Sequence, residues 1–173
     1  MERIHEERSL LERIVGYIPG YRGYKEKELR RESDRLVRMD VVNRLKAAKD
    51  LLKKKRFASP VPLQRISSED MWMLDSLMSR LDRIIQRIDR AVAGYAGMFD
   101  AIKVKEDKLE AALQLDLSLI ERADSLKASA EEFVKAAPGG DEWRRCMDNL
   151  LSRIEEIDNL IDKRVEIFRG LTG

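Results

Sequence analysis

Cysteine and histidine are almost missing from this 173-residue chain, which has one of each, Cys146 and His5. A single cysteine excludes a disulfide within the chain and fits a reducing compartment, so we expect a cytoplasmic protein. Zinc sites normally draw on several Cys or His ligands, and a ferritin-like di-iron centre needs two Glu-x-x-His pairs. We therefore predict no metal and no cofactor, although an all-carboxylate Mg²⁺ or Ca²⁺ site outside an EF-hand loop stays open.

The motifs of catalysis are missing as well. Residues 16–23 are rich in glycine, but they lack the Lys-Ser/Thr ending of a phosphate-binding loop and follow no expected strand. Cys146 falls in a helical pattern, where a cysteine is more often a packing residue than a nucleophile. No apolar run reaches the length of a membrane span, and the charged start at residues 1–3 does not resemble a secretory signal. We expect a non-enzymatic protein with no transmembrane segment and no evident small-molecule substrate.

Asparagine and glutamine are scarce, at three residues each, whereas charged residues make up 38% of the chain. A typical domain is charged at about a quarter of its positions. Few thermolabile amides beside many charges are typical of a heat-tolerant protein. We therefore expect an unfolding midpoint above the mesophile range of about 45–65 °C.

Apolar residues recur at helical spacing in five segments and at strand spacing in none. A short helix is expected over residues 3–15, before a loop of glycine, proline and tyrosine at residues 16–24. Longer helices are expected over residues 24–56, from residue 67 to the glycine at 94, over residues 105–137, and from residue 141 onward. Ser67, with Asp70 three residues later, resembles a capping box, and Asp141 is a natural N-cap for the last helix.

Each long helix has an apolar stripe that predicts its buried face. The clearest is a set of heptad rows in the helix from residue 67: Leu74, Leu81, Ile88 and Tyr95, with Leu77, Ile84 and Ala91, and with Met78, Ile85 and Val92. The stripe of helix 24–56 comprises Leu29, Leu36, Val37, Val41, Leu45, Ala48 and Leu52. The rows of helix 105–137 are Leu109, Asp116, Ala123, Ala130 and Ala137, with Ala112, Leu119, Leu126 and Phe133. The last helix has Trp143, Met147, Leu150, Ile154, Ile157, Ile161 and Phe168.

These patterns predict an all-α fold. Because three of the connections are short, we expect an antiparallel up-and-down four-helix bundle of long, coiled-coil-like helices, preceded by a short N-terminal helix. The chain is then a single helical domain, 1–173, with the short helix and Tyr/Gly loop at 1–23 and the bundle at 24–173. The alternative is a longer three-helix coiled coil in which helix 24–56 swings out or is swapped between subunits.

Two glycine-containing loops carry a family resemblance. The sequence Pro-Gly-Tyr-Arg-Gly-Tyr-Lys-Glu-Lys-Glu at residues 19–28, with Arg-Arg-Glu at 30–32, resembles the opening of a group of uncharacterised small prokaryotic helical proteins. The loop at residues 94–100, Gly-Tyr-Ala-Gly-Met-Phe-Asp, is similar to a second stretch of that group. The resemblance implies a helical fold and no particular activity.

Charge is concentrated in one helix. Residues 22–56 contain 14 Lys or Arg and 6 Asp or Glu, a net charge of +8, whereas the whole chain is +2. A basic helix binds nucleic-acid phosphates or an anionic membrane surface in a salt-dependent way. Such a site would centre on Lys46, Lys49, Lys53, Lys54, Lys55 and Arg56, because acids intervene nearer the start. The alternatives are a solvated or self-complementary face, or docking on the acidic helices of a second subunit.

The four tyrosines, Tyr17, Tyr21, Tyr24 and Tyr95, all lie in or beside glycine-containing loops. One interpretation is that they cap the ends of the bundle with their hydroxyl groups in water. The other is that a Tyr/Gly loop docks a partner.

Asp116 occupies a seam position whose row is otherwise apolar. Either the helix is turned so that Asp116 is exposed, or an arginine from another helix pairs with it. The sharper hypothesis is a buried polar group that fixes helix register or lines a ligand cavity. If its role is structural and replaceable, Asp116→Leu is expected to stabilise the protein.

Together these features favour a non-enzymatic interaction or scaffold protein. It would bind a protein partner, or itself as a homo-oligomer, through a helical face and the Tyr/Gly loops. The alternative is a binder of nucleic acid or of an anionic membrane surface through the basic helix 22–56.

Overall fold

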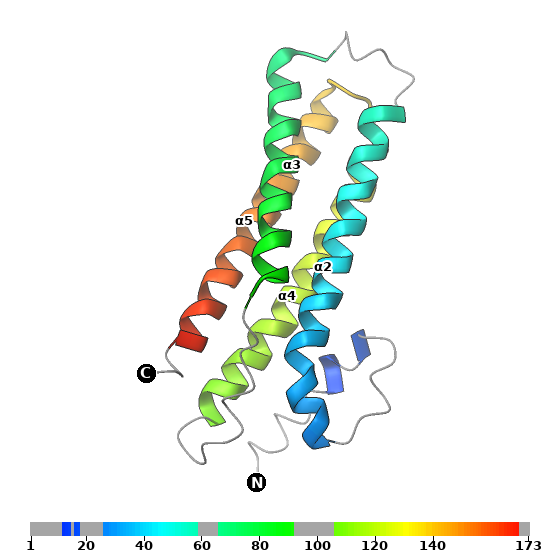
Figure 1. Ribbon diagram of the computed structural model, residues 1–173. Coiled ribbons are helices and arrows are strands. Elements are labelled where there is room, and N and C mark those ends of the chain that lie inside the picture. Colours follow the sequence, from blue (N-terminus) through cyan, green and yellow to red (C-terminus); the bar gives the residue numbers. More distant parts are fainter. Residues whose placement is uncertain (1–11, 15, 18–25, 59–65, 92–105, 170–173) are drawn as a thin grey trace.

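The computed structural model describes residues 12–14, 16–17, 26–58, 66–91 and 106–169 (Figure 1). Side chains are described at residues 12–14, 16–17, 35–54, 66–91 and 111–167. All regular secondary structure in these ranges is helical, so the predicted all-α class is confirmed. No helix in the described part of the chain is long and apolar enough to cross a membrane.

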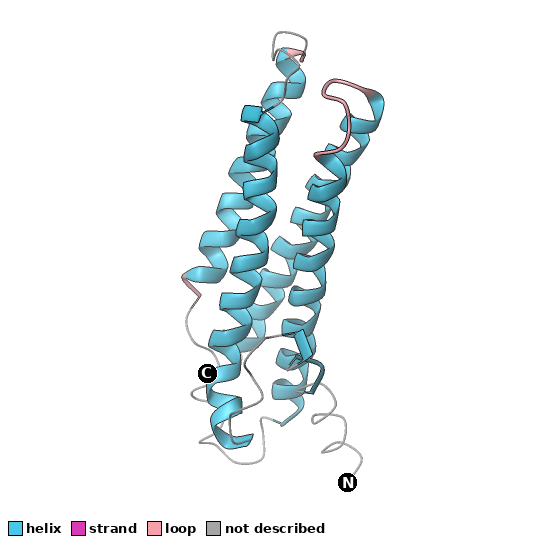
Figure 2. Ribbon diagram, turned by 90° about the vertical axis from the view of Figure 1, so that its right-hand side faces the viewer, coloured by secondary structure: helices cyan, strands magenta, loops and turns pink. Residues whose placement is uncertain are grey.

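Four long helices account for most of the described residues. They are α2 (Glu26–Ala58), α3 (Ser68–Asp89), α4 (Glu106–Phe133) and α5 (Asp141–Arg169). Residues 12–14, 16 and 17 are also helical and form the described part of the N-terminal segment, residues 12–17. Figure 2 shows the four helices side by side along the length of the molecule.

The helices pack in a different order from that expected from their connections. The extensive contacts are α2 with α3, α4 with α5, α2 with α4, and α3 with α5. In Figure 1, α2 and α4 run up the view while α3 and α5 run down it, so the last two of these pairs are parallel. Helices that follow one another in the chain pack together in the pairs α2–α3 and α4–α5, as expected for short connections. The expectation is wrong for α3 and α4, because α3 packs mainly against α2 and α5.

Most residues of the predicted stripes form the core, but Met78 is half-buried and Ala137, which lies beyond the end of α4, is exposed. In α3, Leu74, Leu81 and Ile88 are at most 3% exposed, as expected for one heptad row. The stripes of α2 and α5 are also buried wherever their side chains are described, except that Leu36 is half-buried at the edge of the core. α3 ends at Asp89, before Ala91, so the last predicted turn of its rows lies beyond the helix; Val92 and Tyr95 are outside the described residues.

α4 has a second buried stripe, which the sequence analysis missed. Leu113, Leu117 and Ile120 are buried in addition to the predicted row. This second stripe continues at helical spacing to Asp124, which pairs with α2, whereas Asp116 of the first row pairs with α5. α4 therefore buries two faces, and this explains why it packs against both α2 and α5.

The helix ends follow local rules. The Ser67 hydroxyl accepts a hydrogen bond from the Asp70 backbone N–H at 3.0 Å, which confirms the capping prediction at the start of α3. At α5, the first helical hydrogen bond runs from Arg144 N–H to the Gly140 carbonyl, so the N-cap position is Gly140, one residue before the predicted Asp141. Gly139 has φ 77°, the left-handed conformation that glycine adopts without strain in this turn.

Candidate binding surfaces

Asp116 lies inside the helical assembly and is bound by an arginine. Its side chain is 0% exposed, and Arg164 of α5, at 6%, donates from Nε to Asp116 Oδ1 at 3.0 Å. The pair sits in the interface between α4 and α5. Of the alternatives drawn from the sequence, the geometry is that of a carboxylate paired with an arginine of another helix.

Charged side chains also join the other packed helices. Arg87 of α3 binds both Asp158 and Asp162 of α5, and Arg83 binds Asp158 as well. The hydrogen bond to Asp162 is the largest cause of a raised Arg87 pKa, outweighing the effect of burial. The guanidinium groups of Arg83 and Arg87 thus bind carboxylates of α5, the parallel neighbour of α3.

At the opposite end of α3, the Asp70 carboxylate is 4% exposed and receives two hydrogen bonds from Arg144 of α5, each at 3.0 Å. These bonds lower the pKa of Asp70 below its usual value, against the opposing effect of burial, and the Ser67 hydroxyl contributes in the same direction. Bidentate pairing of this kind fixes orientation as well as distance.

The six proposed anion-binding residues of the basic helix are not equivalent. Lys46, Lys53 and Lys54 are exposed on α2. Lys49 is instead paired with Asp82 of α3, and its side chain is 19% exposed. The side chains of Lys55 and Arg56 lie outside the described residues. Lys49 is therefore engaged in an ion pair between α2 and α3, whereas Lys53 and Lys54 are exposed towards the C-terminal end of α2.

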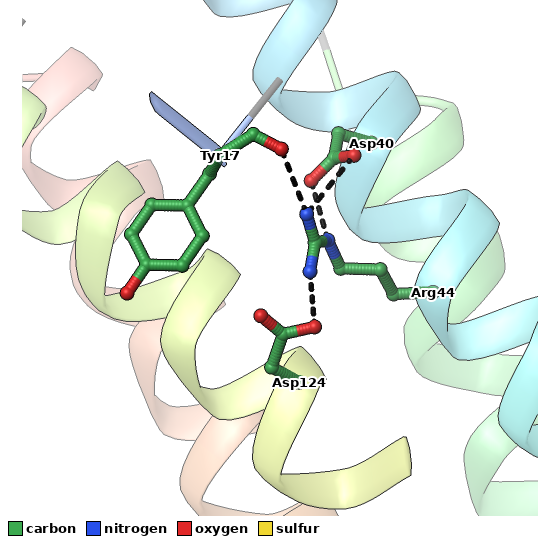
Figure 3. Close-up of polar contacts among 4 residues, drawn as sticks. All are labelled: Tyr17, Asp40, Arg44 and Asp124. Atoms are coloured by element: carbon green, nitrogen blue, oxygen red, sulfur yellow. Dashed lines mark hydrogen bonds and ion pairs between the residues drawn. The ribbon is translucent and has the colours of Figure 1, made fainter. Parts of the chain in front are cut away.

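Tyr17 is the described member of the four tyrosines, and it contacts Arg44 of α2 (Figure 3). Arg44 Nη2 donates to the Tyr17 carbonyl oxygen at 3.0 Å, and its guanidinium carbon lies 5.9 Å from the centre of the Tyr17 ring. That distance is within the range of a cation–π contact. Tyr17 is 36% exposed. Tyr21, Tyr24 and Tyr95 lie outside the described residues.

Arg44 is itself held by two carboxylates. Its Nε donates to Asp40 on the same helix at 2.6 Å, and Nη1 bonds Asp124 of α4. Burial opposes the charge on Arg44, but the hydrogen bonds to Asp40 and Asp124 outweigh burial and raise its pKa. Figure 3 shows the guanidinium between the two carboxylates and the Tyr17 carbonyl, so that one planar group joins α2, α4 and the N-terminal segment.

The N-terminal segment is anchored at two further points. Ile14 is 0% exposed and belongs to the core cluster, and burying an isoleucine side chain contributes about 2 kcal/mol. Arg13 pairs with Glu121 of α4 at 3.1 Å, with both side chains about half exposed (54% and 42%). The ion pair adds little stability because water screens it. Ile14 and the Arg44 contacts therefore hold the segment against α2 and α4, and the surface that it covers there is called the Arg44 groove from here on.

Trp72 was not singled out from the sequence, yet it is 70% exposed on α3. It falls on the side of the helix away from the Leu74, Leu77 and Leu81 rows, because a separation of two residues is about half a helical turn. The other tryptophan, Trp143, is 1% exposed and lies 5.1 Å from Phe133, centre to centre. A large aromatic side chain placed off the stripe is the signal that could have identified Trp72.

One open cleft lies beside α2 and α3, with a volume of about 260 Å³ and a lining of Arg35, Arg38, Met39 and Asp89. Arg38 Nη1 donates a hydrogen bond to the Ala91 carbonyl at 2.7 Å, so a side chain of the cleft binds the backbone just after the end of α3. Met39 is 48% exposed. The cleft is therefore lined mainly by polar side chains, and one of them, Arg38, already binds a backbone carbonyl.

No group of three or more His, Cys, Asp or Glu side chains with metal-site geometry occurs among the residues that the structure describes. Cys146 is half-buried on α5; burial raises the pKa of its thiol, and the charges of Glu142 and Glu132 add to this effect. No protein-family model, curated protein or solved structure matches the chain.

Proposed function

We propose that the protein is a non-enzymatic interaction protein that binds a protein partner, or a second copy of itself, through a helical face. The observation that carries this proposal is Trp72, which is 70% exposed on α3. Tryptophan is enriched among the residues that dominate binding energy at protein interfaces. Its ring supplies a large apolar area with few rotatable bonds, so it loses little entropy when it is covered.

The helix that presents Trp72 is well fixed. Ser67 caps its first turn, and Asp70 is bound by Arg144 of α5. The position of the indole is therefore set by the rest of the protein before any partner arrives. Such preorganisation lowers the entropic cost of association.

The test uses sedimentation velocity over a wide concentration range, with acrylamide quenching of tryptophan fluorescence. If Trp72 lies in a self-interface, the chain associates, Trp72→Ala shifts it towards monomer, and association protects the indole from quencher. Trp72→Phe is the fluorescence control, because the buried Trp143 then supplies the whole signal. For a different protein as partner, wild-type and Trp72→Ala chains serve as matched baits in the native host. Equal recovery by the two baits, combined with a strict monomer, would rule the proposal out.

A second candidate function is binding of nucleic acid or of an anionic membrane surface. It is favoured by the exposure of Lys46, Lys53 and Lys54, which continue in sequence into Lys55 and Arg56. Retention on heparin or DNA at low salt, lost when residues 53–56 are neutralised, would support it. Lys49→Gln is a poor probe here, because it also breaks the ion pair with Asp82. Absence of retention at low salt would remove this candidate.

We further propose that α2 to α5 form a four-helix bundle whose helices alternate in direction along the chain, that this bundle is a single domain, and that the protein is cytoplasmic. The alternating helix directions in Figure 1 support the bundle, and the lone cysteine supports a reducing compartment. We also propose that the protein is related to the group of small prokaryotic helical proteins that its two glycine-containing loops resemble. Cell fractionation in the native host tests the location.

A further inference from the structure

The N-terminal segment occupies the Arg44 groove in the way that a short helical ligand occupies a receptor. Ile14 is fully buried, and Tyr17, three residues later, lies on the same side of a helical turn and contacts Arg44. The segment is held mainly by one apolar anchor, one backbone carbonyl and one aromatic ring. Recognition of an amphipathic segment through a few anchors at this spacing is the helix-in-groove mode of peptide binding.

The receptor side of the groove is organised by groups outside the segment. Arg44 is bonded to Asp40 of α2 and to Asp124 of α4. Those bonds hold the guanidinium with Nη2 directed at the Tyr17 carbonyl (Figure 3). Because these bonds lie within α2 and α4, the donor does not need the segment in order to be positioned, and a preorganised donor binds at a lower entropic cost.

The chemistry of the groove defines what it accepts. It buries a β-branched aliphatic side chain, places a cation against an aromatic ring, and offers Glu121 to a basic residue just before the aliphatic one. The sequence Arg13-Ile14-x-x-Tyr17 meets all three requirements, and every copy of the chain carries both this segment and the groove. Two copies that exchange segments keep every contact and form a closed, reciprocal pair.

We propose that the Arg44 groove is a binding site for the N-terminal segment as a separable ligand, and that the segment it takes from outside the chain is that of a second copy. This inference rests on the proposed function, since it names the partner and the surface for self-association.

The first experiment measures fluorescence anisotropy of a labelled peptide of residues 8–20 with full-length chains. Ile14→Asp, with Tyr17→Ala as a second variant, should vacate the groove. Each should then bind the peptide roughly tenfold or more tightly than the wild type, in which the tethered segment competes at high effective concentration. Circular dichroism establishes that each variant is folded.

Gly16→Ala is the matched variant in the opposite direction. A Cβ at Gly16 meets nothing within 4 Å, and alanine favours the helical conformation of the segment. The tethered segment should then hold the groove more firmly and admit less peptide than in the wild type. The control peptide has Ile14→Asp and should not bind. Failure of the wild-type peptide to bind both vacated, folded variants would overturn the groove as a ligand site.

The second experiment tests exchange between copies. In a Cys146→Ser background, chains with Arg13→Cys are mixed with differently tagged chains with Glu121→Cys and treated with a short bismaleimide. Mixed-tag dimers that increase with incubation time, and that decrease when Gly16→Ala is added, support exchange. If the peptide binds but no mixed-tag dimer forms at any concentration, the second copy is not the ligand. Trp72→Ala should leave this cross-linking unchanged, so failure here is distinguishable from failure of the Trp72 face.

Discussion

Replacing the buried pair of Asp116 and Arg164, singly and together, gives the most direct test of how the core is assembled. Asp116→Leu alone removes the carboxylate that the Arg164 guanidinium, 6% exposed, binds at 3.0 Å. Breaking a buried ion pair on one side typically costs about 3–5 kcal/mol. The expectation from sequence, that this substitution stabilises the protein, is therefore reversed by the presence of Arg164.

The double substitution Asp116→Leu with Arg164→Met should behave differently. Replacing a buried ion pair with apolar side chains of similar size is often neutral, or stabilising by about 1–4 kcal/mol. In a chain of this size, about 1 kcal/mol corresponds to roughly 2–4 °C in the melting temperature. The single variant should thus melt on the order of 10 °C below the parent, and the double variant close to the parent or above it.

The assay is guanidinium unfolding followed by far-UV circular dichroism, analysed as a double-mutant cycle. Arg122 and Glu156 provide a matched control, because they also pair α4 with α5, at 3.3 Å, but are about half exposed (51% and 45%). Their coupling should be no more than about 1 kcal/mol. The reasoning is refuted if Asp116→Leu alone is as stable as the parent, or if the double variant is as unstable as the single one.

Three further predictions concern single groups. Because its hydrogen bonds hold the pKa of Asp70 below the usual value, Asp70 stabilises the fold at neutral pH, and this contribution disappears as the pH falls towards the lowered value. Asp70→Asn should flatten the acid side of the stability–pH profile, whereas Asn at the exposed Asp148 should not; parallel profiles for all three proteins would contradict this. Gly139→Ala should lower stability by about 1 kcal/mol because φ is 77° there, and Gly139→Asn, which tolerates that conformation, should restore most of it in thermal melts. The Cys146 thiol has a raised pKa, so at neutral pH it should be alkylated more slowly than a free cysteine. An equal rate of alkylation would contradict the raised pKa.

Much of the fold follows from spacing alone. The heptad row of Leu74, Leu81 and Ile88 is buried because residues seven apart lie on one side of a helix, whichever helix they face. The cap at Ser67 is equally local, since it depends on a hydroxyl and an N–H three residues away. Most predictions that use only the geometry of one helix are confirmed, although the N-cap of α5 is Gly140 and not the predicted Asp141.

Burial and contacts that depend on how two helices lie against each other could not be predicted from spacing within one helix. Leu113 and Leu117 lie off the main stripe of α4, and they are buried because α4 packs against two neighbours. The partner of Asp116 is 48 residues away in sequence, so it depends on the register of α5 against α4. Arg44 binds three groups from three segments, and no local pattern identifies such a convergence. Trp72 differs, since its position off the stripe was visible.

The order along the chain groups the helices into two hairpins, α2 with α3 and α4 with α5, which residues 90–105 link covalently. Residues 22–91 contain 19 Lys or Arg and 11 Asp or Glu, a net +8, while residues 92–173 contain 12 and 17, a net −5. Most ion pairs described between the hairpins follow this polarity: Arg44, Arg83 and Arg87 of the first bind Asp124, Asp158 and Asp162 of the second. The near-neutral chain is thus a cationic half joined to an anionic half. If it were cut between them, the fragments should reassemble quickly at low ionic strength and more slowly as salt is added.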